Sequence, residues 1–480
     1  MSEKAKNSTD RLGTAPIGRL LFEFALPCIF AEVVYSCYAI VDSAILGWFV
    51  GDYGLAVITL SIPVQNIMMA FGLLIGMGGN ALAAIQLGKG QIDKVELTLG
   101  NSTMLMIVFS IALSIIGMIF IDPLLALIGT TPELWEHTKQ FVSILIVFDI
   151  CVTVGFGLYN FLRTAGKPNL ALASSAFSVV MCIIFNLLFV GLLGFGIAGS
   201  ALATVCGEAT TAIPVIWYFT RAKGAAFHLR LKYLKLDLQD SLTILKLGLA
   251  SFGMQVGSTV VNIVFNHVIA AYGASIAIGV SGCLAGIGVS NRVVWMILSV
   301  FIGITMGMQP IVGYNIGAQN WSRVLKALKI SILSGMTIGL IVLVLIHLFS
   351  DPLLYLFGIG GDLEGFAKWA LTLNMIFCPL VAFQIIGGSY FQSSGQPLKA
   401  ALIELLRQVF LLTPFYLIFP LFAGVFHTNE VNMILAAVPA SDFISCTITF
   451  FIVRYEVKKL KTWIAQADAR DRRLAEEAAV

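Results

Sequence analysis

The chain has 480 residues, of which 58% are hydrophobic and only 11% are charged. Its mean hydropathy of +0.93 lies far outside the usual range of soluble domains. This composition excludes an ordinary water-soluble protein and indicates an integral membrane protein, whereas the net charge of +3 by itself says little about partners.

Long apolar runs recur along the whole chain. A helix needs about 20 apolar residues to cross roughly 30 Å of hydrocarbon, and runs of this kind predict twelve membrane-spanning helices. In chain order they lie near residues 20–50, 56–87, 97–128, 136–162, 169–193, 197–220, 242–272, 281–316, 324–350, 366–391, 398–421 and 431–453. The predicted fold class is therefore all-α integral membrane. Several runs are longer than a bilayer is thick, so tilted or kinked helices are expected.

Positive charge gathers in alternate loops. Most of the 29 Lys and Arg residues lie at the two termini, in the loops at 89–94, 163–167, 221–235 and 323–329, and at 399. The opposite loops hold only Lys139 and Lys368. By the positive-inside rule both termini are predicted to be cytoplasmic. The residues before the first span are polar and carry no cleavage signal, so no removable signal peptide is expected.

Parts of the sequence occur twice. DPLLALIG at 122 recurs as DPLLYLFG at 351, AGKPNLA at 165 recurs as SGQPLKA at 394, and Gly78 and Gly88 match Gly307 and Gly317, always 229 residues apart. The repeated unit holds six spans, so both copies cross the membrane in the same orientation, as parallel repeats of transporters do. The predicted domains are a first bundle at 1–220, a cytoplasmic linker at 221–241, a second bundle at 242–455 and a tail at 456–480. The tail is helical in composition, and a solvated helix is expected there.

Motifs of enzymes are missing from the sequence. It contains no HExxH, GxSxG, P-loop or paired metal motif, so no enzyme activity, metal site or cofactor is expected. All eight cysteines lie in apolar stretches without paired spacing and are expected to be free thiols. The glycines of GMGGNA favour close helix packing over phosphate binding because they lie inside an apolar helix.

Acidic residues inside the spans are more informative. A charge at mid-bilayer costs about 2.5–3.5 kcal/mol on insertion scales, so each acid is expected either to be hydrogen-bonded within a bundle or to have a function. Besides Glu23, which is expected at the interface, they are Glu32, Asp42, Asp149, Glu208, Glu404 and Asp442. Glu32 and Asp42 share the middle of the first span, on neighbouring faces about 80° apart. A buried carboxyl group of this kind can take up and release a proton near neutral pH.

Five motifs together resemble a known transporter family. They are VDSAILG in span 1, GGNALAAIQLGKG in span 2, GFGIAGSALAT at spans 5 and 6, QPIVGYNIGA in span 8 and LLRQ in span 11. Over roughly residues 15–455 the chain looks like the multidrug and toxic compound extrusion (MATE) family, and most like its bacterial MepA-like branch. The resemblance implies two six-helix bundles in a V around a central cavity. It also implies export of organic cations and amphipathic drugs in exchange for protons or sodium.

The resemblance also implies a cation site in the first bundle. The family's acid in span 1 falls on Asp42, its Asn and Asp in span 5 fall on Cys182 and Asn186, and its Thr in span 6 falls on Thr204. Two of these four positions have lost the expected oxygen ligand or charge. Hard cations prefer oxygen ligands, so proton coupling through Asp42 is favoured over a sodium site.

Two further acids are candidates to replace the missing one. Glu32 lies in the same span as Asp42, and Glu208 follows Thr204 by four residues, on the same helix face. The second bundle has Asn266 where the first has Asp42. Coupling is therefore expected to be confined to the first bundle.

Substrate contacts are predicted from flexible and polar side chains. Methionine repacks around dissimilar ligands because its side chain is flexible and polarisable, although core packing also explains methionines at this density. The candidate cavity residues are Met68, Met69, Met77, Met254, Met306, Gln309, Asn315, Arg292 and Arg407. The two arginines are equally explained as internal ion-pair partners, for example of Glu404. His267 and His347 are expected to be hydrogen-bonded rather than proton relays.

The favoured function is a proton-coupled antiporter that exports cationic amphipathic molecules by alternating access, with sodium as the other possible coupling ion. It is expected to be a multi-pass monomer in the bacterial plasma membrane, with small molecules and membrane lipid as partners and no nucleic acid. One alternative is a flippase for a lipid-linked headgroup or an exporter of an endogenous metabolite. Another is a receptor or channel that does not transport by alternation.

Overall fold

A computed structural model describes residues 10–222, 224–273, 279–356 and 362–478. Over these ranges the chain is almost entirely helical and contains no strand. The first half comprises α2 (Ile17–Phe49), α3 (Asp52–Gly88), α4 (Ile92–Ile119), α5 (Ile121–Leu127), α6 (Trp135–Val147), α7 (Asp149–Tyr159), α8 (Phe161–Thr164), α9 (Pro168–Asn186), the π-helical turn η1 (Leu187–Leu192) and α10 (Gly196–Arg221). The second half comprises the short 3₁₀ turn η2 (Leu231–Tyr233), α11 (Leu238–Tyr272), α12 (Gly279–Gly317), α13 (Trp321–Leu356), α14 (Asp362–Met375), α15 (Cys378–Ser393), α16 (Pro397–Leu405), the π-helical turn η4 (Leu406–Leu412), α17 (Thr413–Ile418), the 3₁₀ turn η5 (Phe419–Phe422) and α18 (Glu430–Ala478).

The helices account for the twelve predicted spans. Among the described residues, ten helices are long and apolar enough to cross a membrane, and two bent helix pairs bring the number to twelve. The bends are 52° between α6 and α7 and 46° between α14 and α15. They occur at Phe148 and Phe377, which are equivalent positions of the repeat. Hydropathy therefore predicted the spans correctly, but it gave no sign that the fourth span of each bundle is broken.

The internal repeat is confirmed by matching ion pairs. Lys139 Nζ lies 2.7 Å from Asp122 Oδ1, and Lys368 Nζ lies 2.5 Å from Asp351 Oδ1. Both members of the second pair are 229 residues after those of the first. The same contact therefore forms at the same place in each bundle, at the DPLL motifs that revealed the repeat.

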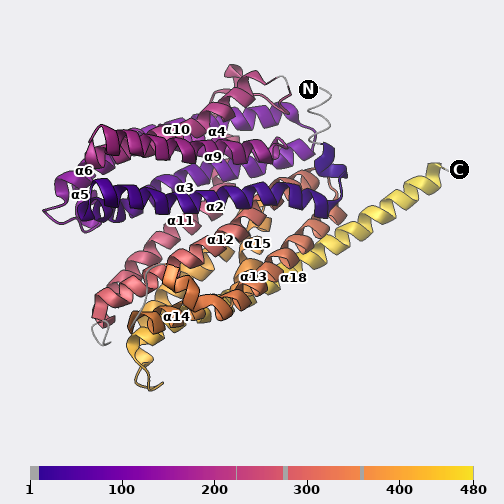
Figure 1. Cartoon of the computed structure of the whole chain (residues 1–480). Coiled ribbons are helices and arrows are strands. Elements are labelled where there is room, and N and C mark those ends of the chain that lie inside the picture. The colour runs from indigo at the N-terminus through magenta and orange to yellow at the C-terminus, as the bar shows by residue number, and fades with distance from the viewer. Residues whose placement is uncertain (1–9, 223, 274–278, 357–361, 479–480) are drawn as a thin grey trace.

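The two halves of the chain form separate groups of helices that meet at one end. Figure 1 shows the N-terminal half, in indigo to magenta, diverging from the C-terminal half, in orange to yellow, with increasing distance from the chain termini. The bundles meet chiefly through α3 against α11 and α2 against α12. The end at which both termini lie is called the terminal end below.

Glycines allow the bundles to touch backbone to backbone near the terminal end. A Cβ atom added at Gly88 would lie 1.9 Å from the carbonyl oxygen of Tyr314, and one at Gly317 would lie 2.0 Å from that of Ile85. These two contacts are related by the repeat, because each residue and its counterpart are 229 positions apart. A second close approach joins Gly248 of α11 to the backbone of Leu74 in α3. Any side chain at these positions would push the bundles apart.

Both terminal segments are attached to the second bundle. Asn315 Nδ2 donates to the carbonyl of Leu12 at 2.9 Å, and Arg323 Nη2 donates to that of Ala15 at 2.6 Å. The predicted tail is helical and continues α18 without a break. Its first turns are packed rather than solvated, because the ring of Trp463 packs at a tilt against that of Trp321 in α13, with ring centroids 4.5 Å apart.

Candidate functional site

Asp42 lies on α2 and is held by a side chain of α9. Asn186 Nδ2 donates to Asp42 Oδ1 at 2.8 Å, and the Tyr38 hydroxyl, one turn earlier on α2, lies 3.3 Å from the same oxygen. Asn186 is fully buried at the last residue of α9, where the helix changes to the π-helical turn η1. Short π-helical segments are often found at functional sites because they re-aim side chains. Asp42 is thus a partly buried carboxyl group with a fixed hydrogen-bond donor.

The other two positions implied by the resemblance lie beside it. The Tyr38 hydroxyl is also within reach of the Cys182 thiol and the Thr204 hydroxyl. The Cys182 sulfur packs so tightly against α10 that a Cβ added at Gly207 would lie 2.0 Å from it. Asp42, Cys182, Asn186 and Thr204 therefore converge through Tyr38, a residue that the sequence analysis did not single out.

Two further carboxyl groups surround the same region. The Tyr35 hydroxyl lies within electrostatic range of Glu208, Glu32 and Asp42, and Cys182 lies within range of Glu208 and Asp42. Glu208 follows Thr204 by one turn on α10, as the spacing of four predicted. All six residues predicted for coupling therefore belong to one region of the first bundle.

The groups around Asp42 include an amide N–H and a thiol. Asn186 directs an N–H group, not an oxygen, at Asp42, and its own Oδ1 is buried without a hydrogen-bond partner among the described residues. Cys182 adds a thiol, which is a poor ligand for a hard cation. No group of three or more His, Cys, Asp and Glu side chains could hold a metal ion in the described ranges. A carboxyl group, by contrast, needs no cage to bind a proton.

Arg163 is a buried cation that the sequence analysis placed in a loop. Its side chain is only 1% exposed, and its guanidinium lies 5.0 Å from the centre of the Tyr159 ring. Nη2 donates to Asn160 Oδ1, but Nε and Nη1 have no hydrogen-bond partner within the described part of the chain. Arg163 acts electrostatically on Glu32. Arg163 directly follows a predicted span, where the sequence does not decide whether a residue belongs to the helix or to the loop. This position is the one sequence signal that could have indicated its burial.

The second bundle contains a buried ion pair between Arg407 and Asp442. Arg407 Nε lies 2.6 Å from Asp442 Oδ1, and Asp442 is 1% exposed. Glu404, which was given as an example of a partner, is within electrostatic range of Arg407. Ser441 fixes the same turn by donating to the carbonyl of Arg407 at 2.9 Å. Asp442 and Arg407 are therefore structural partners of each other.

Breaking this pair should destabilise the protein. Arg407→Met would leave Asp442 buried without its partner, and such changes typically cost about 3–5 kcal/mol. We expect a clearly lower midpoint of thermal unfolding in detergent. The matched control is Lys368→Met, which breaks an exposed pair with Asp351 and should leave the midpoint unchanged. Equal shifts for the two variants would contradict the structural role of Arg407.

The predicted cavity residues do not form one surface. Met68, Met77, Met306 and Gln309 are buried, and Gln309 lies 3.2 Å from Ser389 inside the second bundle. Asn315 is buried and holds the N-terminal segment. Met69 and Met254 are half-buried, and Arg292 is exposed on α12. Their assignment to a substrate cavity stays a prediction.

A contact that the sequence did not reveal joins the two bundles. Gln255 Nε2 of α11 donates to Asn66 Oδ1 of α3 at 3.1 Å. Five residues further along α3, Phe71 meets Phe252 edge to face, with ring centroids 5.2 Å apart. Amide and aromatic side chains of both bundles therefore lie opposite each other at this level of the interface.

The chain is similar to known membrane transporters in sequence. The MatE family model matches residues 27–188 and 250–417, one segment in each bundle. The chain is 23% identical over 406 residues to the multidrug export protein MepA of Staphylococcus haemolyticus, with 85% of this chain and 88% of that protein covered. It is 22% identical over 408 residues to MepA of Staphylococcus aureus strain MSSA476, with 85% and 88% covered.

Solved structures show the same fold. A MOP superfamily transporter from Pyrococcus furiosus has a TM-score of 0.86 and 19% identity, with 96% of this chain and 99% of that chain covered. An outward-facing multidrug resistance transporter of the MATE family has a TM-score of 0.84 and 20% identity, with 94% and 98% covered.

Proposed function

The chain belongs to the MatE family of membrane transporters, and on that premise we propose that it is a secondary antiporter that exports cationic amphipathic molecules in exchange for protons. Proteins similar to it are multidrug export proteins. The observation that carries the proposal is the hydrogen bond of 2.8 Å by which Asn186 holds Asp42. It makes Asp42 an acceptor at the junction of α2, α9 and α10.

A proton and a cationic substrate would compete for the same charge. The ionised carboxylate of Asp42, reinforced by Glu32 and Glu208, attracts a cation into the first bundle. Two unit charges 4 Å apart near a protein surface interact with an energy of about 4 kcal/mol. Neutralising one carboxylate therefore changes the affinity for a cation by more than tenfold. Antiport requires that the protein binds either the proton or the substrate, but not both at the same time.

Protonation would also change the contact between α2 and α9. A hydrogen bond to an ionised group is roughly twice as strong as one between neutral groups, so neutral Asp42 holds Asn186 more weakly. The freed α2 packs against α12 of the other bundle and can transmit the change to the bundle interface. The proton shifts the equilibrium between the two conformations only to the extent that it binds one of them more tightly than the other.

The basic loops support an orientation with the terminal end in the cytoplasm. In that orientation the bundles are in contact at the cytoplasmic side, as the glycine contacts show, and diverge toward the outside. A protein of this shape would take up protons from outside and bring substrate from the cytoplasm in its other conformation. We further propose that the functional unit is a monomer.

The alternative function, a flippase for a lipid-linked headgroup, receives less support. A cavity that holds phosphate should be lined by free cations. Arg407 is paired with Asp442, and Arg163 is enclosed within the first bundle. Export of cations agrees better with three acids near Tyr35.

The coupling ion is tested with purified protein in liposomes and a fluorescent cation. One pH unit corresponds to about 1.36 kcal/mol, so exchange of one proton per monovalent cation can sustain about a tenfold concentration difference. We expect a pH gradient to drive this accumulation, and a sodium gradient at equal pH to drive none. Accumulation with sodium alone would contradict proton coupling, and an unsaturable current would contradict alternating access.

A further inference from the structure

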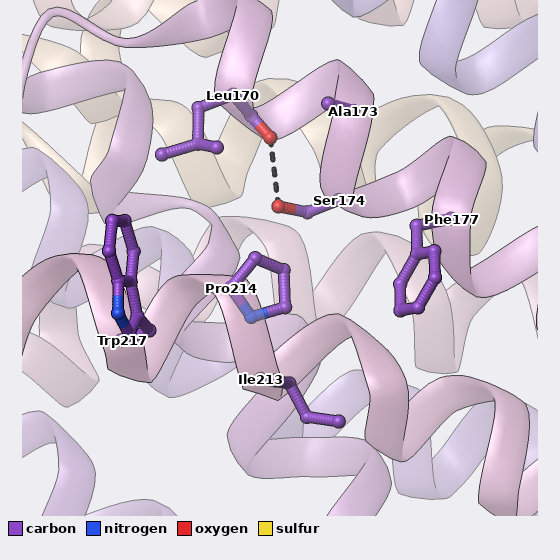
Figure 2. Close-up of a pocket in the computed structure, with 7 residues that line it drawn as sticks. All are labelled: Leu170, Ala173, Ser174, Phe177, Ile213, Pro214 and Trp217. Carbon is purple, nitrogen blue, oxygen red and sulfur yellow. Dashed lines mark hydrogen bonds between the residues drawn. The ribbon is translucent and has the colours of Figure 1, made fainter.

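A groove runs along the outer surface of the first bundle, between α9 and α10. Its volume is about 420 Å³. Figure 2 shows side chains of the two helices facing each other across it. Its lining includes Leu170, Ala173 and Phe177 of α9 and Ile213, Pro214 and Trp217 of α10.

The groove is apolar and faces away from the bundle. Ser174 is its one lining hydroxyl, and it already donates to the carbonyl of Leu170 at 2.8 Å. Ile213 is 63% exposed and Trp217 is 58% exposed. Apart from the Ser174 hydroxyl, the side chains of the groove offer one polar group, the indole N–H of Trp217. An apolar groove on the lipid-facing side of a membrane helix pair suits a hydrocarbon chain.

Two cations lie just beyond one end of the groove. α9 and α10 follow each other as antiparallel spans, so the start of α9 and the end of α10 lie at the same end. Lys167 precedes Leu170 by three residues, and Arg221 follows Trp217 by four, which places each about one helical turn beyond the lining. None of the ion pairs found within the described ranges includes Lys167 or Arg221.

The combination of an apolar groove and two cations at one end matches one kind of ligand. We propose that the groove binds an anionic phospholipid, with an acyl chain between α9 and α10 and its headgroup phosphate at Lys167 and Arg221. Trp217 lies between chain and headgroup, the level at which tryptophan is enriched in membrane proteins. In the orientation proposed above this is the cytoplasmic leaflet, where anionic lipids give the surface its negative potential. The site does not depend on the coupling mechanism.

The position of Trp217 allows a local test. Full-length protein is reconstituted in phosphatidylcholine vesicles that contain a small fraction of lipid with brominated chains, either phosphatidylglycerol or phosphatidylcholine. The fluorescence emission of Trp217 is obtained by subtracting the emission of the Trp217→Phe variant from that of the wild type. Each cation contributes about fivefold to the attraction of an anionic lipid, so brominated phosphatidylglycerol should quench Trp217 at about a 25-fold lower fraction than brominated phosphatidylcholine.

Matched variants assign the effect to the groove. Lys167→Ala with Arg221→Ala should abolish the preference for phosphatidylglycerol. Lys326→Ala with Lys329→Ala, which removes two exposed cations of α13, should keep it. Ala173→Phe, which fills the groove while leaving both cations, should reduce quenching by either lipid. The exposed Ala112→Phe on α4 is its control and should have no effect.

The alternative results would overturn the proposal. Equal quenching by the two brominated lipids would show that the groove does not select an anionic lipid. Loss of the preference in the α13 variant would show a general surface effect. Reversal of the quenching by soluble glycerol 3-phosphate would show that the cations bind free phosphate. Unchanged quenching in Ala173→Phe would place the lipid outside the groove.

Discussion

Asp42→Asn should reduce uphill export of a cationic substrate to the level of protein-free liposomes. The amide keeps the size of the side chain and can still accept from Asn186, but it carries no charge and binds no proton. Under the proposed mechanism this removes both the attraction for the cation and the response to the pH gradient. The measurement is accumulation of a fluorescent cation under an imposed pH gradient.

The controls separate loss of coupling from loss of structure. Asp122→Asn removes an exposed carboxylate of an outer ion pair and should leave accumulation unchanged. Asp42→Glu keeps a titratable carboxyl group and should retain a measurable part of the activity. Wild-type accumulation by Asp42→Asn would disprove the assignment of Asp42 as the coupling group.

Gly317→Ala should prevent the bundles from closing at the terminal end. The added Cβ would lie 2.0 Å from the carbonyl oxygen of Ile85, and backbone cannot move aside as a side chain can. Overpacking of this kind costs about 1–3 kcal/mol, which corresponds to a roughly 5- to 150-fold lower population of the closed conformation. Transport should fall by a similar factor, because each cycle passes through that conformation.

The matched control lies on the same helix. A Cβ at Gly288 of α12 would meet nothing within 4 Å, so Gly288→Ala should transport at the wild-type rate. Gly88→Ala, the counterpart of Gly317 in the repeat, should be as harmful as Gly317→Ala. Normal transport by both Gly88→Ala and Gly317→Ala would show that contact at this end is not needed for the cycle.

Hydropathy and repetition were enough to predict most of the architecture. Apolar runs located the spans because crossing a bilayer demands about 20 apolar residues whatever the packing. The constant separation of the motifs predicted the parallel repeat, which the matching Asp122 and Asp351 ion pairs confirm. The breaks at Phe148 and Phe377 were missed although Asp149 directly follows the first and Pro379 lies two residues after the second. Each pair of helices is apolar enough to pass as one continuous span, so hydropathy alone does not separate them.

The site was predictable only in part. The resemblance assigned Asp42, Cys182, Asn186 and Thr204, and the helical spacing added Glu208. Which side chain contacts which depends on packing between helices, and a single sequence does not contain it. Tyr38 was therefore missed as the common neighbour.

Charged residues show the same limit. Arg163 was assigned to a loop because a cation at the end of an apolar run looks solvated, yet it is enclosed by the bundle. Arg407 was expected to have an internal ion-pair partner, with its sequence neighbour Glu404 as an example, and the partner is Asp442 from α18. In both cases the tertiary contact, and not the local sequence, decides the role of the charge.

Competition between a proton and a cation at Asp42 is tested most directly by measuring the protons that are released when substrate binds. Purified protein in weakly buffered detergent is mixed with a cationic substrate, and a pH indicator reports protons released at a starting pH near neutral. If proton and cation compete for Asp42, the wild type releases protons on binding and Asp42→Asn releases none. Equal release by both proteins, or binding without release by the wild type, would contradict the proposed exchange at this carboxyl group.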